Sequence, residues 1–212
     1  MTNELTTSWA MLVALGAFHG INPGMGWLFA VALGMQERRR GAVIRALLPL
    51  CAGHALAVAA AVAAALAIGT VVPIGWLQWT VAGVLVALGA MRFFRHRHRR
   101  WAGMRVGMGG LTLWSFLMAT AHGAGLMVVP VFVGMTMAGG GEHVHHGMPV
   151  NDAGAALLAT GLHAAGYLIV TAFVALLVFE KLGVGLLRRA WFNLDLIWAS
   201  ALVVTGALTL SL

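Results

Sequence analysis

Six long apolar runs decide what this chain can fold into. They cover residues of about 8–34, 43–69, 71–94, 109–138, 153–179 and 190–211. Each is about 20 residues or longer, the length at which an α-helix crosses roughly 30 Å of hydrocarbon. Only 9% of the residues are charged, whereas a soluble domain carries about 25%. The sequence therefore predicts an all-α integral membrane protein, with six transmembrane helices forming a single membrane domain over residues 1–212.

The 13 basic residues lie only in or beside alternate connections between these runs. They follow the first, third and fifth runs, as Arg38, Arg39, Arg40 and Arg45, then Arg92, Arg95, Arg97, Arg99, Arg100 and Arg105, then Lys181, Arg188 and Arg189. Connections rich in Lys and Arg stay in the cytoplasm. The pattern predicts an N-out/C-out, multi-pass protein of a bacterial-type inner membrane, with the 139–152 loop outside.

The cytoplasmic connection 95–108 contains the run RHRHRR at 95–100. A basic run can bind nucleic acid, but this one directly follows an apolar span. Its orientation and the attraction of anionic lipid head groups account for it. We therefore expect lipid and no nucleic acid at this connection. Association of the chain with copies of itself stays open.

Four histidines lie inside the apolar runs, at His19, His54, His122 and His163. Each is about 10 to 12 residues from the end at which its span begins, or roughly 15 to 18 Å along a helix. That depth is close to the midplane of a bilayer. Because a polar ring in hydrocarbon is costly unless it has a partner, such residues tend to face the interior of a bundle and to mark a site or pathway.

The two halves of the chain carry matching patterns around these histidines. The strings FHGINPGM and AHGAGLMVVP lie in the first and fourth runs, and GHALAV and LHAAGY lie in the second and fifth. Three spans per half is an odd number, which predicts a 3+3 inverted repeat of residues 8–94 and 109–211. Many secondary transporters have this architecture, with midplane sites at interrupted helices.

The expected interruptions fall at matching places in the two halves. Asn22-Pro23-Gly24 interrupts the first span, and Gly123, Gly125 and Pro130 loosen the fourth. The glycine ladder Gly16, Gly20 and Gly24 also allows close approach of helix backbones.

The mirrored imidazoles favour a transition-metal cation as substrate. The predicted site consists of His19, Asn22, His54, His122 and His163, with Met25, Cys51, Met118 and Tyr167 as accessory groups. The outer loop adds His143, His145, His146 and Glu142. Imidazole with thiol or thioether suits nickel, cobalt, copper or zinc. Since no ATP-binding loop is present, transport would be coupled to protons or to an ion gradient.

The string GAFHGINPGMGW, followed about thirty residues later by GHALAV, resembles the nickel/cobalt transporter (NicO-like) family of the LysE superfamily. The match covers about the first 70 residues. Those six-span proteins carry a His-Gly-Leu-Glu-Pro-Gly-His-like stretch in the first helix, a histidine in the second, and often a His-rich loop. The resemblance implies that His19, Pro23 and Gly24 belong to the first motif and that His54 is the second-helix histidine.

Two positions depart from that motif. Asn22 replaces the family's acidic residue, and Met25 replaces the second histidine of the motif. The departures remove a negative charge and a hard ligand, so the choice of ion and the direction of transport stay open.

Three other functions use the same residues. A haem b protein would take pairs of the buried histidines as axial ligands. A transporter of a small organic solute would use them as hydrogen-bonding or proton-carrying groups. A membrane enzyme would use His19 and His122 as acid and base, but paired carboxylates and a nucleophile with an oriented base are both missing from the sequence.

Overall fold

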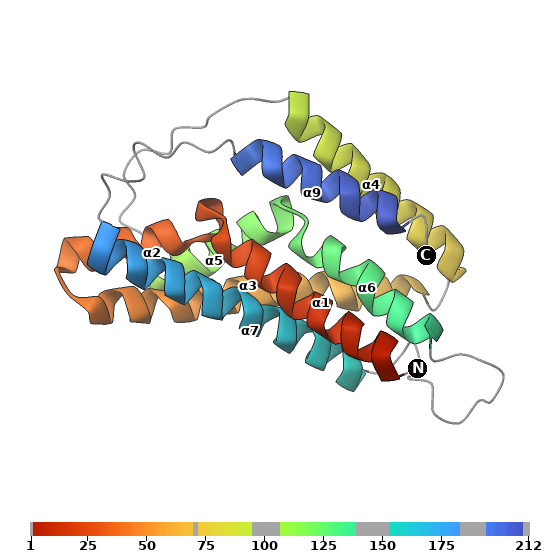
Figure 1. Ribbon diagram of the computed structural model, residues 1–212, viewed down its shortest axis with the longest axis horizontal. Helices are drawn as coiled ribbons and strands as arrows, with labels where there is room; N and C mark the ends of the chain where they lie inside the picture. The colour runs from red at the N-terminus through yellow and green to blue at the C-terminus, as the bar shows by residue number, and fades with distance from the viewer. Residues whose placement is uncertain (1, 70–71, 95–106, 139–152, 183–193, 210–212) are drawn as a thin grey trace.

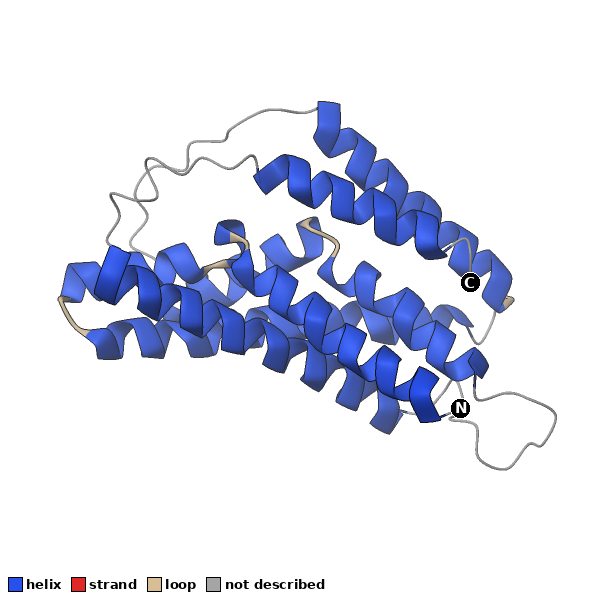
Figure 2. Cartoon of the chain, viewed as in Figure 1, coloured by secondary structure: helices blue, strands red, loops and turns tan. Residues whose placement is uncertain are grey.

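The computed structural model describes residues 2–69, 72–94, 107–138, 153–182 and 194–209 (Figure 1). Every element within these residues is helical (Figure 2). In chain order the elements are α1 (Thr2–Ile21), the 3-10 turn η1 (Pro23–Met25), α2 (Trp27–Glu37), α3 (Arg40–Gly69), α4 (Ile74–Phe94), α5 (Met108–Ala121), α6 (Ala124–Ala138), α7 (Ala153–Leu177), the π-helical turn η2 (Val178–Leu182) and α9 (Leu194–Thr209).

Each predicted apolar run coincides with one helix or with a helix broken in two. Two helices are long and apolar enough to cross a membrane, α3 and the continuous stretch Ala153–Lys181. A third candidate arises if α5 and α6, which are bent by 60° at a short break, count as one span. The helices α1, α4 and α9 contain shorter apolar stretches. The all-helical fold class is therefore confirmed, with two to three candidate membrane-spanning helices.

The helices form a main bundle and a separate pair (Figure 1). The bundle consists of α1, α2, α3, α5, α6 and α7, and the antiparallel helices α4 and α9 lie together over one side of it. Glycine allows close approach within the pair, because a Cβ atom at Gly89 would lie 2.9 Å from the backbone oxygen of Ala199. Leu85 and Leu202 join the pair to a buried cluster that includes Met127 of α6.

Backbone contact through glycine also holds the bundle together. A Cβ atom at Gly16 of α1 would overlap the carbonyl oxygen of His163, and one at Gly20 would lie 2.7 Å from the carbonyl oxygen of Tyr167. Gly53 of α3 likewise faces the backbone of α5. Small residues at the interface let the backbones of two membrane helices approach closely, which increases their contact area. The two predicted ladder positions Gly16 and Gly20 thus lie in the α1–α7 interface.

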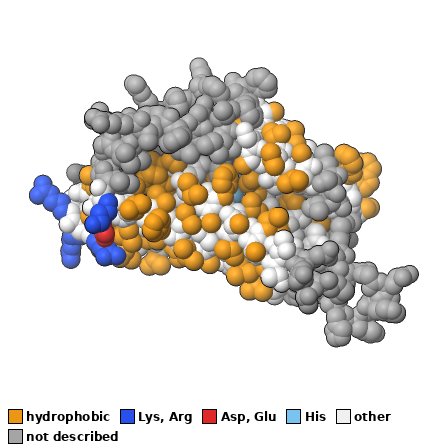
Figure 3. Space-filling view, in the orientation of Figure 1, with side chains coloured by type: hydrophobic (Ala, Val, Ile, Leu, Met, Phe, Trp, Pro, Cys, Tyr) orange, Lys and Arg blue, Asp and Glu red, His pale blue; other side chains and the backbone are white. Residues whose placement is uncertain are grey.

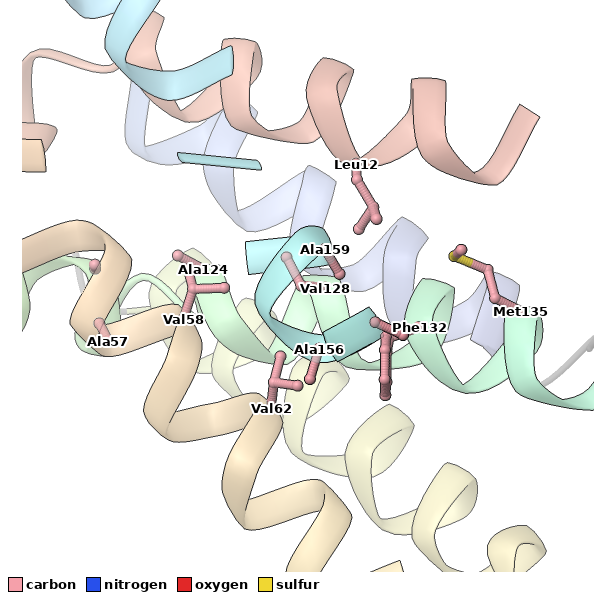
Figure 4. Close-up of a cluster of buried hydrophobic side chains, with 12 residues drawn as sticks. Leu12, Ala57, Val58, Val62, Ala124, Val128, Phe132, Met135, Ala156 and Ala159 are labelled. Carbon is pink, nitrogen blue, oxygen red and sulfur yellow. The ribbon is translucent and has the colours of Figure 1, made fainter. Parts of the chain in front are cut away.

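Two of the three buried apolar clusters lie along the bundle on either side of the buried histidines. One cluster lies where α1, α3, α6 and α7 meet, and includes Leu12, Val58, Val128 and Phe132 (Figure 4). The other lies nearer the α2–α3 turn and includes Leu50. His54 falls between Leu50 and Val58 along α3, so the buried histidines lie at the level where one apolar cluster gives way to the other.

The described surface is apolar along its length and charged at one end. Lys and Arg side chains gather where α2, α3 and η2 meet (Figure 3). Arg40 pairs with Glu180 at 3.2 Å, and Arg45 pairs with Glu37 at 2.6 Å. These ion pairs are exposed and contribute little stability, but the first one places two of the predicted basic connections at the same end of the molecule. The start of α1 and the end of α9 lie toward the opposite end (Figure 1).

The interruption of the fourth predicted span lies at one of the three residues proposed for it. The helix breaks at His122–Gly123, where Gly123 has a φ of 71°. Gly125 and Pro130 both lie within α6, which runs through them. Gly125 has a different role, because a Cβ atom there would lie 3.2 Å from the carbonyl oxygen of Ala57 on α3. Of the three residues, only Gly123 therefore lies at the break itself.

Candidate functional site: a buried histidine cluster

Three of the four predicted intramembrane histidines come together in the bundle. The ring of His19 on α1 lies 5.5 Å from that of His54 on α3 and 5.1 Å from that of His163 on α7, measured between centroids. The rings of His54 and His163 are 5.3 Å apart and nearly parallel. All three side chains are fully buried. Three helices thus each contribute one imidazole to a single cluster.

Hydrogen bonds define which nitrogen of each ring carries the proton. Nδ1 of His19 lies 2.7 Å from the carbonyl oxygen of Leu15, and Nδ1 of His163 lies 3.2 Å from that of Leu12. A carbonyl oxygen only accepts, so both Nδ1 atoms donate and both Nε2 atoms carry a lone pair. This is the arrangement by which proteins orient metal-ligating histidines.

The third ring, His54, must take the other tautomer. Its Nε2 lies 3.2 Å from Nε2 of His163. Because Nε2 of His163 carries a lone pair, Nε2 of His54 donates, and its Nδ1 is left with a lone pair. That Nδ1 atom is buried and has no hydrogen-bond partner. One hydrogen bond, from Nε2–H of His54 to Nε2 of His163, therefore links two of the three rings.

Tyr167 links this cluster to the break in the first span. Its ring stacks on His54, with 4.0 Å between centroids and 4° between planes. Its hydroxyl donates to the carbonyl oxygen of Met25 at 2.7 Å. Tyr167 is fully buried and is the single tyrosine of the chain. One side chain thus contacts both the imidazole cluster and the 3-10 turn.

The first span leaves α-helical geometry at the residues proposed for its interruption. Pro23 and Gly24 lie in η1, and Asn22 caps this turn by accepting the N–H of Gly24 at 2.8 Å. Gly26 has a φ of 122°, a conformation that side-chain-bearing residues rarely adopt. The indole of Trp27 then donates to the carbonyl oxygen of Ile21 at 2.9 Å, across the turn.

The fourth histidine, His122, lies at the break between α5 and α6. Its Nδ1 donates to the carbonyl oxygen of Met118 at 2.8 Å. A Cβ atom built on Gly24 would lie 3.2 Å from Oδ1 of Asn22, 3.6 Å from Cε of Met118 and 3.8 Å from Cε1 of His122. Thus side-chain atoms of Asn22, Met118 and His122 lie close together beside the first break.

The remaining predicted residues are placed as follows. Met25 and Cys51 both contact the apolar cluster beside the α4–α9 pair, where Met25 is buried and Cys51 is half-buried. The outer-loop residues Glu142, His143, His145 and His146 lie outside the described residues.

Among the residues that the structure describes, no group of three or more His, Cys, Asp or Glu is arranged to hold a metal ion. The distance between the Nε2 atoms of two of these rings is nevertheless close to the distance between two nitrogen ligands of one metal ion. A tetrahedral ion with nitrogen ligands at 2.0 to 2.1 Å separates those nitrogens by about 3.3 Å, and the Nε2 atoms of His54 and His163 are 3.2 Å apart. A bound ion would therefore have to replace the hydrogen bond between these two rings.

Two buried polar residues near the site were missing from the sequence prediction. Ser115 of α5 donates to the carbonyl oxygen of Leu50 at 2.6 Å, and Thr171 of α7 is also buried. Helical spacing could have indicated both residues, since Ser115 is seven residues before His122 and Thr171 is four residues after Tyr167.

No family model, curated protein or solved structure matches the chain.

Proposed function

We propose that this protein is a secondary transporter that moves a transition-metal cation of the nickel, cobalt, copper and zinc class across a bacterial-type inner membrane. The single observation that carries the proposal is the cluster of His19, His54 and His163. Buried imidazoles inside an apolar bundle are costly, and they typically mark a substrate or proton pathway. The resemblance of the first 70 or so residues to the nickel/cobalt transporter family points to the same cargo class.

The way the rings are held supports a cation as cargo. Two of the rings, His19 and His163, direct Nε2 lone pairs away from the backbone carbonyls that hold them. The third, His54, joins them once its proton moves from Nε2 to Nδ1, a change of tautomer that releases no proton from the cluster. If one ring of the cluster is protonated before loading, the incoming cation displaces that proton, which couples the movement of the cation to the movement of a proton.

We further propose six spans in a 3+3 inverted repeat. The first span would consist of α1, η1 and α2, the fourth of α5 and α6, and the others of α3, α4, α7 and α9. Two features support it. The α1–α7 and α3–α5 interfaces, which the repeat would exchange, are both formed by glycine facing backbone. The basic end lies opposite the start of α1 and the end of α9, which is consistent with an N-out/C-out protein that has a cytoplasmic basic end.

The geometry does not favour haem b as a bound group. Bis-histidine ligation needs two imidazoles facing each other across a flat macrocycle. The Nε2 atoms of His54 and His163 are in direct hydrogen-bond contact, and Tyr167 covers His54 at 4.0 Å. These contacts leave no space for a porphyrin between the two rings, so a small ion is the better fit.

The test is transport by purified protein in proteoliposomes. Entry of Ni²⁺, Co²⁺ or Zn²⁺ into the vesicles would be followed with an encapsulated metal-sensitive dye, with and without a pH gradient. We expect the His54→Ala and His54→Gln variants to fall to the rate of protein-free vesicles. Leu157→Ala, at a position that is 71% exposed on α7, serves as the control for insertion and folding and is expected to match the parent.

Two outcomes would contradict the proposal. Transport by both His54 variants at the parental rate would remove the cluster from the pathway. A folded parent protein that moves no metal in either direction would exclude metal as the cargo, and a small organic solute would then replace it.

A further inference from the structure

Two buried hydroxyl groups behave differently from the other hydroxyl groups of the described helices. The hydroxyl groups of several threonines donate to the carbonyl oxygen four residues earlier on the same helix, at Thr80, Thr112, Thr120 and Thr209. Ser115 of α5 donates instead across the bundle to Leu50 of α3. Oγ1 of Thr171 on α7 is buried and has no hydrogen-bond partner. Neither buried hydroxyl group is thus committed to the backbone of its own helix.

These hydroxyl groups meet at the hydroxyl of Tyr167. Those of Ser115 and Thr171 both lie close enough to that of Tyr167 to interact with it. Tyr167 donates to the carbonyl oxygen of Met25 at 2.7 Å. Ser115 donates to that of Leu50 at 2.6 Å. Five oxygen atoms, three from hydroxyl groups and two from carbonyl groups, therefore gather where η1, α3, α5 and α7 meet, and each residue that supplies one is at most 1% exposed.

We propose that these five oxygen atoms bind Na⁺ as the coupling ion of the transporter. This inference rests on the proposed function, because only a transporter needs a coupling ion. Hard cations take oxygen ligands, and backbone carbonyl groups at interrupted helices coordinate Na⁺ in secondary transporters. The carbonyl group of Met25 is of this kind, since it lies in the turn between α1 and α2. Five uncharged oxygens suit one positive charge, whereas divalent sites usually include carboxylates.

The hydroxyl of Thr171 is the atom that indicates a missing ligand. A buried hydroxyl group without a hydrogen bond costs free energy, and in a membrane helix it usually bonds to the carbonyl oxygen four residues earlier. For Thr171 that acceptor is the carbonyl oxygen of Tyr167, which faces Gly20 of α1. The threonine hydroxyl lies beside the tyrosine hydroxyl instead. A cation among the five oxygens would supply a partner for this oxygen.

Tyr167 connects the five oxygens to the histidine cluster. Its hydroxyl belongs to the proposed Na⁺ site, and its ring stacks on His54 with 4.0 Å between centroids. An ion between Tyr167 and Met25 would replace their hydrogen bond, because the hydroxyl proton must turn away from a cation. Occupancy of the site therefore acts on the side chain that covers His54. A proton displaced at the rings and a Na⁺ ion at this site are separate contributions to the driving force.

The test uses full-length protein in detergent micelles, without transition metal. The chain has a single tyrosine, so labelling tyrosine with ¹³C at Cζ gives one NMR signal that needs no assignment. NaCl would replace choline chloride at constant ionic strength. We expect the signal to shift with Na⁺ and to reach saturation. A site that holds only water gives no saturable shift, and that result overturns the proposal.

Thr171→Val removes one ligand and keeps the shape of the side chain. Folding should not suffer, because the lost hydroxyl makes no hydrogen bond. We expect the tyrosine signal to need roughly tenfold more Na⁺ in this variant, because the affinity of such sites depends on the number of ligands. Thr80→Val, at an exposed position on α4, is the matched control and should behave as the parent. Equal Na⁺ affinity in Thr171→Val and the parent contradicts the proposal.

The Na⁺ titration and the metal-transport assay fail independently, because the titration contains no transported metal. A folded parent protein that moves no metal but shows the Na⁺-dependent shift would refute the proposed function and keep the Na⁺ site. A parent protein that transports metal, and whose tyrosine signal does not respond to Na⁺, would keep the proposed function and overturn the Na⁺ site.

Discussion

The two helix breaks lie at matching places in the chain but are built differently. The first, at residues 22–26, is a 3-10 turn held by three side-chain hydrogen bonds, from Gly24 to Asn22, from Trp27 to Ile21 and from Tyr167 to Met25. The second consists of two residues, His122 and Gly123. There the backbone N–H groups of His122 and Gly123 bond to Met118 and Thr120, and Gly123 has a left-handed φ of 71°.

This difference suggests a division of labour between the halves. Side-chain hydrogen bonds restrict the first break and connect it, through Tyr167, to the histidine cluster. The second break has one such bond, from Nδ1 of His122 to the carbonyl oxygen of Met118, and a glycine, Gly123, in the left-handed conformation. The helices α5 and α6 are bent by 60° across it. We expect the first break to act as a rigid part of the site and the second to be where the chain bends as a substrate passes.

The largest expected effect is that of Gly26→Ala. A side chain at a φ of 122° is strained, and its Cβ atom would lie 2.5 Å from Cδ2 of Leu50. Strain and overpacking together should cost about 3 kcal/mol of stability. The measurement is the thermal unfolding midpoint in detergent, with Gly41→Ala, where no atom would lie within 4 Å, as the control. An unchanged midpoint would show that the first break is not rigid.

A smaller loss of stability is expected for Gly123→Ala, about 1.5 kcal/mol, because an alanine can occupy the left-handed region at that cost. The nearest atom to the added carbon is Cδ2 of Leu202 at 3.2 Å, which is the mobile end of a side chain. We expect the transport rate to fall by more than the loss of folded protein accounts for, because this is the break assigned to bending. If transport were normal and only the melting temperature fell, bending would have to be assigned elsewhere.

The smallest expected change in stability is that of Tyr167→Phe. This variant keeps the ring on His54 and removes the hydroxyl bond to the carbonyl oxygen of Met25. Hydrogen bonds between membrane helices contribute on average about 0.6 kcal/mol, up to about 1.7. We expect equilibrium metal binding to persist while transport slows, because the first break would no longer be coupled to the cluster. Loss of binding and transport together would indicate instead that the hydroxyl group merely keeps the site folded.

The amino-acid sequence predicts much of the helical framework. Six apolar runs coincide with the helices and helix pairs of the structure, and Asn22-Pro23-Gly24 coincides with the 3-10 turn, because proline cannot donate a hydrogen bond inside a helix. Pro130 carries the same local signal yet lies within the continuous helix α6. The same residue type therefore breaks one helix and leaves another intact, so the outcome depends on the surrounding residues as well as on the proline.

The sequence by itself determined the helical class, the lengths of the apolar segments and which side chains are too polar to face lipid, since these follow from local composition and helix period. Tertiary structure alone decided which of the buried polar side chains contact one another. The sequence groups His122 and His163 in one predicted site, but helix packing puts His163 against His54 and puts His122 beside Gly24. The physical reason is that ring contacts depend on the crossing of helices distant in sequence, and glycine faces such as those of Gly16 and Gly53 set how closely those helices approach.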